Sequence, residues 1–146
     1  MYAFMAEGAA EKRLPVVDYL RIPETGEPYL EGHKCVECAE VYLSKRLACP
    51  KCSSRRPMRT VRLSNRGHLY SFSIVHRSFP GIPVPYVSAI VDLDGGGTLK
   101  GNLIDVDPDP AAIEFGMPVQ VVFGDALGRQ DRDGNSYLSY FFQPKR

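Results

Sequence analysis

The chain has 146 residues, 44% of them hydrophobic and 24% charged, which is typical of one folded domain with a small accessory module. No stretch reaches the roughly 20 apolar residues that a membrane-spanning helix needs. The net charge is +1, from 18 basic and 17 acidic residues, so no overall field favours nucleic acid or an anionic membrane. Residues 1–13 do not resemble a secretory signal peptide, and we expect a cytoplasmic protein.

The first 29 residues are predicted to form an N-terminal extension with one short helix. Pro15 fits the first turn of that helix, and Val16, Val17 and Leu20 would share one face. Pro23 would end it. Such a short helix is not stable alone, so it must dock on this chain or on a partner. The apolar side chains proposed for docking on a partner are Phe4, Tyr19, Leu20 and Ile22.

Two Cys-x-x-Cys pairs lie in a module that we place at residues 30–56. Cys35 and Cys38 form the first pair and Cys49 and Cys52 the second, with ten residues between the pairs. Joined by a short hairpin, the pairs can place four thiolates around one tetrahedral metal ion. They are all the cysteines of the chain, so none is left for catalysis. We predict a zinc ribbon with one structural zinc ion per chain.

Three alternatives to zinc follow from the same cysteines. Disulfides belong to oxidising compartments, which the N-terminus does not indicate. A redox-active pair would open a helix in a βαβ context that the neighbouring residues do not suggest. Iron stays open because rubredoxins also use four cysteines, although their two pairs normally lie much further apart. A tetrathiolate has no open coordination position, so the metal is assigned to folding.

From Met58 onward the hydrophobic period changes to two, which predicts half-buried strands. The five alternating sets are Tyr70, Phe72 and Ile74; Val87, Ala89, Val91 and Leu93; Leu99, Gly101 and Leu103; Val119, Val121 and Phe123; and Leu138, Tyr140 and Phe142. Glycines at 95–97 and the segment 128–135 predict hairpin turns. Residues 109–116 predict one or two helical turns with Asp109 as N-cap. This is the layout of a five-stranded OB-fold barrel at 57–146, with a small open sandwich as the alternative.

The chain resembles the DUF35 family, whose members combine a rubredoxin-like zinc ribbon with an OB-fold. The resemblance covers residues 29–144 and is carried by YLEGHKCVEC at 29–38, CPKC at 49–52, GHLYSFSIVH at 67–76, PYVSAIVDL at 85–93, GMPVQVVF at 116–123 and FQP at 142–144. The chain departs from the family in having no tryptophan. It also carries Ala39 and Ser53 where relatives have a glycine after each cysteine pair.

The resemblance implies a non-catalytic subunit of a heteromeric, thiolase-type acyl-CoA acyltransferase. A thiolase-like partner would supply the nucleophilic cysteine, while this chain would support assembly and form part of the entrance for acyl-CoA or CoA. The 2-benzoylsuccinyl-CoA thiolase type is one candidate for the complex, and acetoacetyl-CoA thiolase complexes are another. An aldolase or a hydratase is a further candidate partner.

Side chains for CoA binding are predicted in two places. Fixed basic groups hold phosphates best, and the candidates near the cysteines are Lys45, Arg46, Arg55, Arg56 and Arg66. The proline-rich loop at 77–86 is expected to be stiff and to present Phe79 and Tyr86 along the pantetheine arm. A solvated basic surface and a loop that caps the barrel are the simpler interpretations.

No catalytic residue is predicted. His33 and His68 lie at module edges, and His76 closes an apolar strand, so each is assigned a structural role. Single-stranded nucleic-acid binding is the alternative function, with aromatics on the barrel stacking on bases in a basic groove. The net charge of +1 argues against it. So does the alternation that is expected to turn Tyr70 and Phe72 toward the core.

Overall fold

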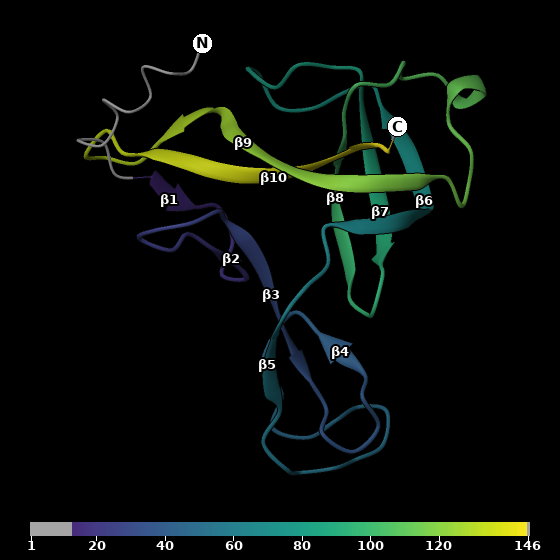
Figure 1. The fold of residues 1–146 in the computed structure, drawn as a ribbon. Helices are drawn as coiled ribbons and strands as arrows, with labels where there is room; N and C mark the ends of the chain where they lie inside the picture. Colours follow the sequence, from purple (N-terminus) through teal and green to yellow (C-terminus); the bar gives the residue numbers. More distant parts are fainter. Residues whose placement is uncertain (1–12, 146) are drawn as a thin grey trace.

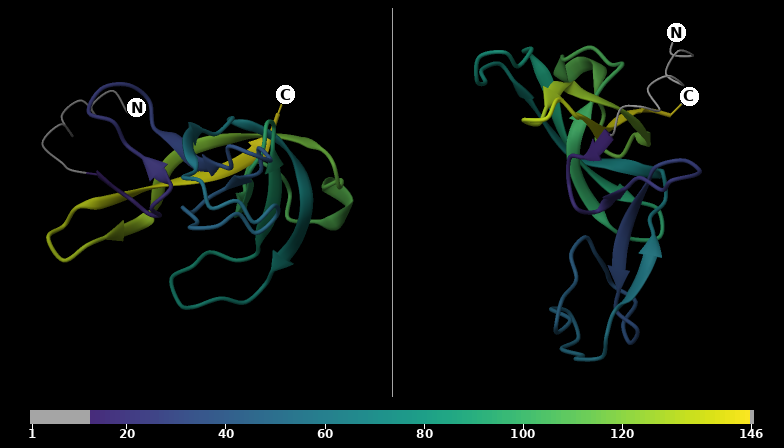
Figure 2. Two further views of the ribbon diagram at one scale, coloured as in Figure 1. Left: turned by 90° about the horizontal axis from the view of Figure 1, so that it is seen from below. Right: turned by 90° about the vertical axis from the view of Figure 1, so that its left-hand side faces the viewer.

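The computed structural model describes residues 13–145, which form a β-barrel and a narrower ribbon that projects from it (Figure 1). The elements are β1 (Arg13–Pro15), β2 (Leu20–Arg21), β3 (Tyr29–Lys34), β4 (Val41–Tyr42), β5 (Arg59–Arg62), β6 (Arg66–Val75), β7 (Tyr86–Leu93), β8 (Thr98–Leu103), the 3₁₀ helix η2 (Pro110–Ala112), β9 (Pro118–Gln130) and β10 (Ser136–Pro144). Figure 2 shows β3 and β5 running from the barrel into the ribbon.

The barrel is built from β6 to β10. The sheet order is β1-β10-β8-β7-β6-β9, and β10 also pairs with β9, so the sheet closes on itself. All contacts between barrel strands are antiparallel except that of β10 with β8, at Phe142 opposite Leu103. Closure leaves few unpaired strand edges. The prediction of a five-stranded barrel is confirmed.

Alternate residues of the barrel strands point into one apolar core, as predicted. The buried side chains include Val87, Ala89, Val91, Leu93, Leu99, Leu103, Val119, Val121, Leu138, Tyr140 and Phe142. Gly67 lies where β6 pairs with both β7 and β9. A Cβ atom at this position would lie 2.4 Å from the carbonyl oxygen of Asp92, so only glycine fits this crossing.

Strand β6 departs from the predicted alternation at Tyr70. Leu69 pairs with Val91 but Ser71 pairs with Ile90, so β6 holds one extra residue here, a β-bulge. The bulge changes which side chains face inward. Phe72 still packs against the core, whereas Tyr70 is 65% exposed. The expectation that Tyr70 faces the core was therefore wrong.

The predicted N-terminal helix is absent: among residues 13–145 the only helical element is η2. Residues 13–15 instead form β1, which runs parallel to β10, and the N–H of Val16 donates to the carbonyl of Leu138 (3.0 Å). The sheet edge satisfies backbone groups that a helix too short to be stable would have left to water.

The N-terminal extension docks on its own chain. Leu20 is 1% exposed within the common core, and the Tyr19 hydroxyl lies 2.6 Å from that of Tyr140. The proposal that Leu20 contacts a partner is therefore wrong. Tyr19 is half-buried, and its contact with a partner stays a prediction. Ile22 is 37% exposed and stays a candidate, while Phe4 lies outside the described residues.

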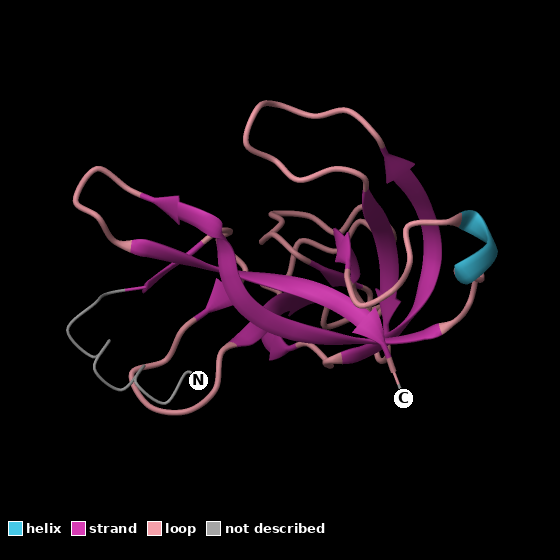
Figure 3. Cartoon of the chain, turned by 90° about the horizontal axis from the view of Figure 1, so that it is seen from above, coloured by secondary structure: helices cyan, strands magenta, loops and turns pink. Residues whose placement is uncertain are grey.

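The short helix before β9 has the predicted cap. Asp109 accepts a hydrogen bond from the N–H of Ala111 (2.9 Å), and Pro110 opens the turn. The helix lasts only three residues because the chain behind it joins β6: the N–H of Gly116 donates to the carbonyl of Leu69 (2.7 Å). Figure 3 shows η2 at one side of the barrel and the β9–β10 hairpin extending from the other.

The base of the ribbon shares its core with the barrel. Leu30 and Leu63 belong to the same buried cluster as the barrel strands, and Val41 packs against this cluster. At the tip of the β7–β8 hairpin, a Cβ atom on Gly96 would lie 2.7 Å from a methyl group of Val41. The predicted boundary near residue 57 falls just before β5, which pairs with β3.

Candidate metal centre and its surroundings

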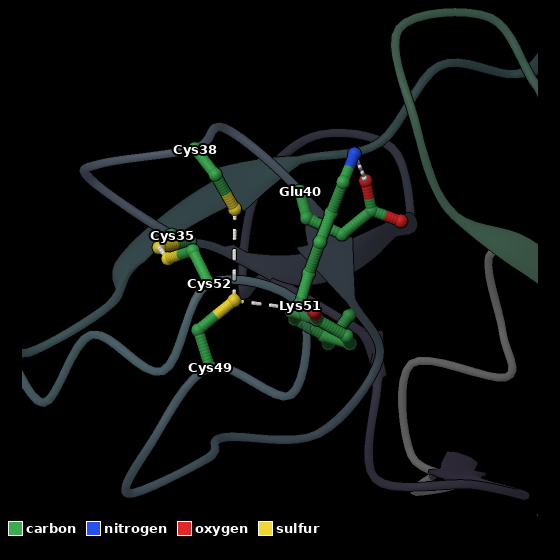
Figure 4. A network of polar contacts seen from close by, with 7 residues as sticks. Cys35, Cys38, Glu40, Cys49, Lys51 and Cys52 are labelled. Atoms are coloured by element: carbon green, nitrogen blue, oxygen red, sulfur yellow. Dashed lines mark hydrogen bonds and ion pairs between the residues drawn. The ribbon is translucent and has the colours of Figure 1, made fainter.

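The four cysteines meet at the tip of the ribbon (Figure 4). All four sulfur atoms lie within 4.8 Å of one another. The Cys35–Cys52 and Cys38–Cys49 sulfurs are each 3.6 Å apart. Four bonds of about 2.3 Å to one tetrahedral ion would place sulfurs about 3.8 Å apart. The predicted ligand set is therefore assembled with spacings that fit one metal ion.

The two cysteine pairs have the same backbone conformation. The N–H of Ala39 donates to the carbonyl of Cys35 (3.0 Å), and the N–H of Ser53 donates to that of Cys49 (2.8 Å). Ala39 and Ser53 both lie in the left-handed region, with φ of 68° and 67°. Glycine adopts this conformation without a Cβ clash. Both positions where the resemblance leads us to expect glycine thus lie in the left-handed region.

Backbone N–H groups point at the sulfurs. Those of Cys38 and Glu37 lower the pKa of Cys35. The corresponding groups of Cys52 and Lys51 act on Cys49. Hydrogen bonds to sulfur favour the thiolate, which is the form that binds a metal.

Tyr42 distinguishes Cys49 from the other three cysteines. Its hydroxyl lies 3.3 Å from the sulfur of Cys49. This hydrogen bond is the main cause that lowers the pKa of Cys49 to about 6. The same contact raises the pKa of Tyr42 to about 12. The sequence offered no signal for this contact, because the β3–β4 register that places Tyr42 opposite His33 sets it.

Four thiolates select a soft or borderline cation, and zinc and iron both fit this donor set. All four coordination positions would be filled by protein sulfur, which leaves no place for an activated water. A metal ion bound in this way would tie the two cysteine pairs together and would have no open position for hydrolysis. Neighbouring groups add contacts at the surface, such as that of Lys51 with Glu40 (3.3 Å).

The structure places the predicted CoA-binding residues at two ends of the molecule. Lys45, Arg46, Arg55 and Arg56 lie exposed on the ribbon, and Arg66 begins β6 at the barrel end next to it. Arg46 lies over the ring of Tyr42, 5.2 Å from its centre.

Phe79 and Tyr86 lie at the opposite end of the barrel, in or beside the loop that joins β6 to β7 (Figure 1). Phe79 is 79% exposed, and Tyr86 lines an apolar groove of about 290 Å³ with Ile104 and Leu127. The nine residues of β6 that follow Arg66, about 30 Å of extended strand, separate it from this loop. The two predicted groups are not brought together.

The fold and the cysteine cluster define a class of small proteins in which a four-cysteine ribbon is attached to a closed five-stranded barrel. The family model for the ChsH2 C-terminal OB-fold domain matches residues 60–124. A DUF35 domain-containing scaffold protein of Methanothermobacter thermautotrophicus is 33% identical over 119 residues, which are 80% of this chain and 86% of that protein. The chain belongs to the DUF35 family.

Two further relatives are known as parts of enzymes. The benzoylsuccinyl-CoA thiolase subunit BbsA of Thauera aromatica is 32% identical over 127 residues, covering 86% of this chain and 84% of that one. Among solved structures, the Ltp2-ChsH2(DUF35) aldolase matches with a TM-score of 0.61 and 30% identity, over 80% of this chain and 84% of that chain. Along residues 13–145 we find no helix long and apolar enough to cross a membrane.

Proposed function

We propose that this chain is a non-catalytic subunit of a heteromeric, thiolase-type acyl-CoA acyltransferase in the cytoplasm. The similarity to a benzoylsuccinyl-CoA thiolase subunit over 84% of that protein carries the proposal. The engagement of all four cysteines in one cluster supports it, because the nucleophilic thiol of a thiolase must then come from a partner subunit.

The metal in this proposal is one structural zinc ion per chain, held by Cys35, Cys38, Cys49 and Cys52. Binding of zinc orders the ribbon, as it does in zinc-finger peptides, where it contributes roughly 10–16 kcal/mol. Metal analysis of the purified chain distinguishes zinc from iron, and a red preparation would indicate iron.

The ribbon is proposed to form one wall of the entrance for the CoA ester. Its exposed cations Lys45, Arg46, Arg55 and Arg56, together with Arg66, are assigned to the phosphates. We separately propose that Phe79 and Tyr86 contact the far end of the pantetheine arm of the CoA ester, since they lie at the opposite end of the barrel from the ribbon. Arg→Ala changes in the basic set should weaken CoA binding by the complex, and unchanged affinity throughout would remove the phosphate role.

Co-purification from the native host tests the assembly role directly. We expect a thiolase-like subunit to elute with this chain in gel filtration. Deleting the first 24 residues is a poor probe of docking, because Leu20 belongs to the core. Ile22→Asp is a sharper one, since it places a charge on the exposed part of that segment. Isolation of the chain without any acyl-CoA enzyme, or rapid acyl-thioester turnover by the chain alone, would contradict the proposal.

Single-stranded nucleic-acid binding is the second candidate, and the exposure of Tyr70 favours it because a free aromatic face can stack on a base. Against it, residues 67–146 carry six basic and nine acidic residues. A groove that follows a phosphate backbone normally has the opposite balance. Salt-dependent binding of a single-stranded oligonucleotide is the test.

A further inference from the structure

The positive charge of the chain is concentrated in the ribbon. Residues 29–66 hold nine Lys and Arg against three Glu, whereas the rest of the chain is acidic. Four thiolates around a divalent ion carry a net charge of about −2. That charge offsets only part of the ribbon's surplus of six positive charges. The ribbon therefore stays basic with its metal bound.

Two of these cations are held against each other by the sheet. Lys34 ends β3 and lies directly opposite Arg59, the first residue of β5. Directly opposed residues in an antiparallel pair have Cβ atoms about 4.5–5.5 Å apart, and like charges in this position are destabilising. Neither side chain has an ion-pair partner among residues 13–145.

A cleft beside Lys34 allows an anion to approach, while Arg59 lies outside the residues that line it. Lys34 is half-buried and lines a cleft of about 340 Å³ between the ribbon and the β7–β8 hairpin, together with Ser64 and Asp94. Asp94 also lines this cleft, and its carboxylate lies 3.6 Å from Nδ1 of His68. Arg59 is exposed at the strand end. Within residues 13–145, no carboxylate lies close enough to Lys34 or Arg59 to form an ion pair with either.

We propose that Lys34 and Arg59 form a phosphate site. The ligand's identity rests on the proposed function, in which the site receives a phosphate at the nucleotide end of a CoA ester. The two strands fix the backbone positions of both residues before the ligand arrives, so only the side chains need ordering on binding. This distinguishes them from Lys45, Arg55 and Arg56, which lie on irregular segments of the ribbon.

A purely structural role makes a different prediction. If Lys34 and Arg59 served to offset the charge of the metal centre, their removal would weaken metal binding and lower the unfolding temperature. If Lys34 and Arg59 instead form a ligand site, removing one of the two charges relieves the repulsion between them. The unfolding temperature of the ligand-free chain then stays equal or rises.

The experiment uses the full, zinc-loaded chain as wild type, Lys34→Gln, Arg59→Gln and the double variant. Calorimetry with CoA, 3′-dephospho-CoA and pantetheine measures affinity, and thermal unfolding with and without CoA measures stability. Arg132→Gln is the control, because it removes one positive charge from the distant β9–β10 turn. We expect each variant in the pair to weaken CoA binding about tenfold, corresponding to about 1.4 kcal/mol. Binding of pantetheine, which lacks the nucleotide, should not change.

Four outcomes would overturn the site: no CoA binding by the wild-type chain, unchanged affinity in both single variants, an equal loss in Arg132→Gln, or loss of zinc in Lys34→Gln. Oligonucleotide binding that depends on the same two residues and outcompetes CoA would overturn the CoA assignment. A result in which the chain binds CoA through Lys34 and Arg59 but co-purifies with no acyl-CoA enzyme would refute the proposed function and leave the site standing.

Discussion

At the scale of single residues, Tyr42 makes the candidate metal centre asymmetric. The two cysteine pairs have matching backbone hydrogen bonds, yet the hydroxyl of Tyr42 contacts Cys49 alone. A hydrogen bond from a neighbouring side chain fixes the orientation of a ligand and stabilises its thiolate. Tyr42 therefore contributes to the affinity of the centre although it is not a ligand.

We predict that Tyr42→Phe weakens zinc binding about tenfold, at the lower end of the range for residues that support metal ligands. Competition with a chromophoric chelator measures the affinity. Substituting cobalt adds a spectroscopic readout, because the thiolate-to-metal bands should shift when one sulfur loses a hydrogen bond. Tyr70→Phe, at an exposed tyrosine outside the ribbon, is the matched control. Equal zinc affinities in the two variants would contradict the role of Tyr42.

Ala39 and Ser53 provide a second prediction at this scale. An L-residue in the left-handed region costs about 1–2 kcal/mol, and glycine avoids this cost. Glycine also makes the unfolded chain more flexible, which cancels part of the gain in stability. Ala39→Gly should therefore stabilise the metal-loaded chain by about 0.5–1 kcal/mol in urea unfolding. Ala48→Gly serves as the control, since the positive φ angles of this ribbon do not include residue 48, and it should destabilise. A loss of stability in both variants would show that residue 39 is unstrained.

The clustering of the four cysteines could be predicted because the information for it is local. Two Cys-x-x-Cys pairs fix their own geometry through hydrogen bonds inside each turn. The contact of Tyr42 with Cys49 and the opposition of Lys34 and Arg59 could not be predicted in this way. Both depend on the register between strands, which the sequence specifies only through long-range packing.

At the scale of elements, alternation predicted the barrel strands well where the strand pairing is regular. It failed at Tyr70, because the bulge between Leu69 and Ser71 puts the residues before it out of phase with Phe72, which faces the core as predicted. The N-terminal segment failed for another reason. Its apolar spacing fits a short helix, but the open edge of β10 offers hydrogen bonds that such a helix cannot match.

The contact between the β7–β8 hairpin and the ribbon gives a prediction at this scale. Gly96→Ala places a methyl group 2.7 Å from Val41 at a residue with φ of 118°, so we expect a loss of about 2–3 kcal/mol in equilibrium unfolding. Gly95→Ala isolates the backbone component, because it has φ of 84° and no atom within 4 Å of the added methyl. The difference between the two variants measures how firmly the ribbon packs on the hairpin. Equal losses of stability in Gly96→Ala and Gly95→Ala would mean that Val41 can move away from the added methyl group without a loss of stability.

At the scale of the whole molecule, charge and apolar surface are separated. The basic ribbon lies at one end, while the loop with Phe79 and the acidic segment around η2, with Asp107 and Asp109, lie at the other (Figure 1). A polyanionic ligand is therefore attracted to the ribbon end and repelled from the η2 end. This arrangement supports the assignment of phosphates to the ribbon. Phe79 and Leu127 are exposed apolar side chains of the barrel part of the chain.

Metal removal tests whether ribbon and barrel form one cooperative unit. Leu30 and Leu63 lie in the core that the barrel strands also line, so an unfolded ribbon would leave part of that core open. We predict that a strong chelator abolishes amide protection in β3 and β5 and also lowers the unfolding temperature of the barrel, without unfolding it at room temperature. Hydrogen exchange resolved by residue separates the two effects. Readdition of zinc should restore both. If the chelator leaves the unfolding temperature of the barrel unchanged, Leu30 and Leu63 contribute little to the stability of the barrel.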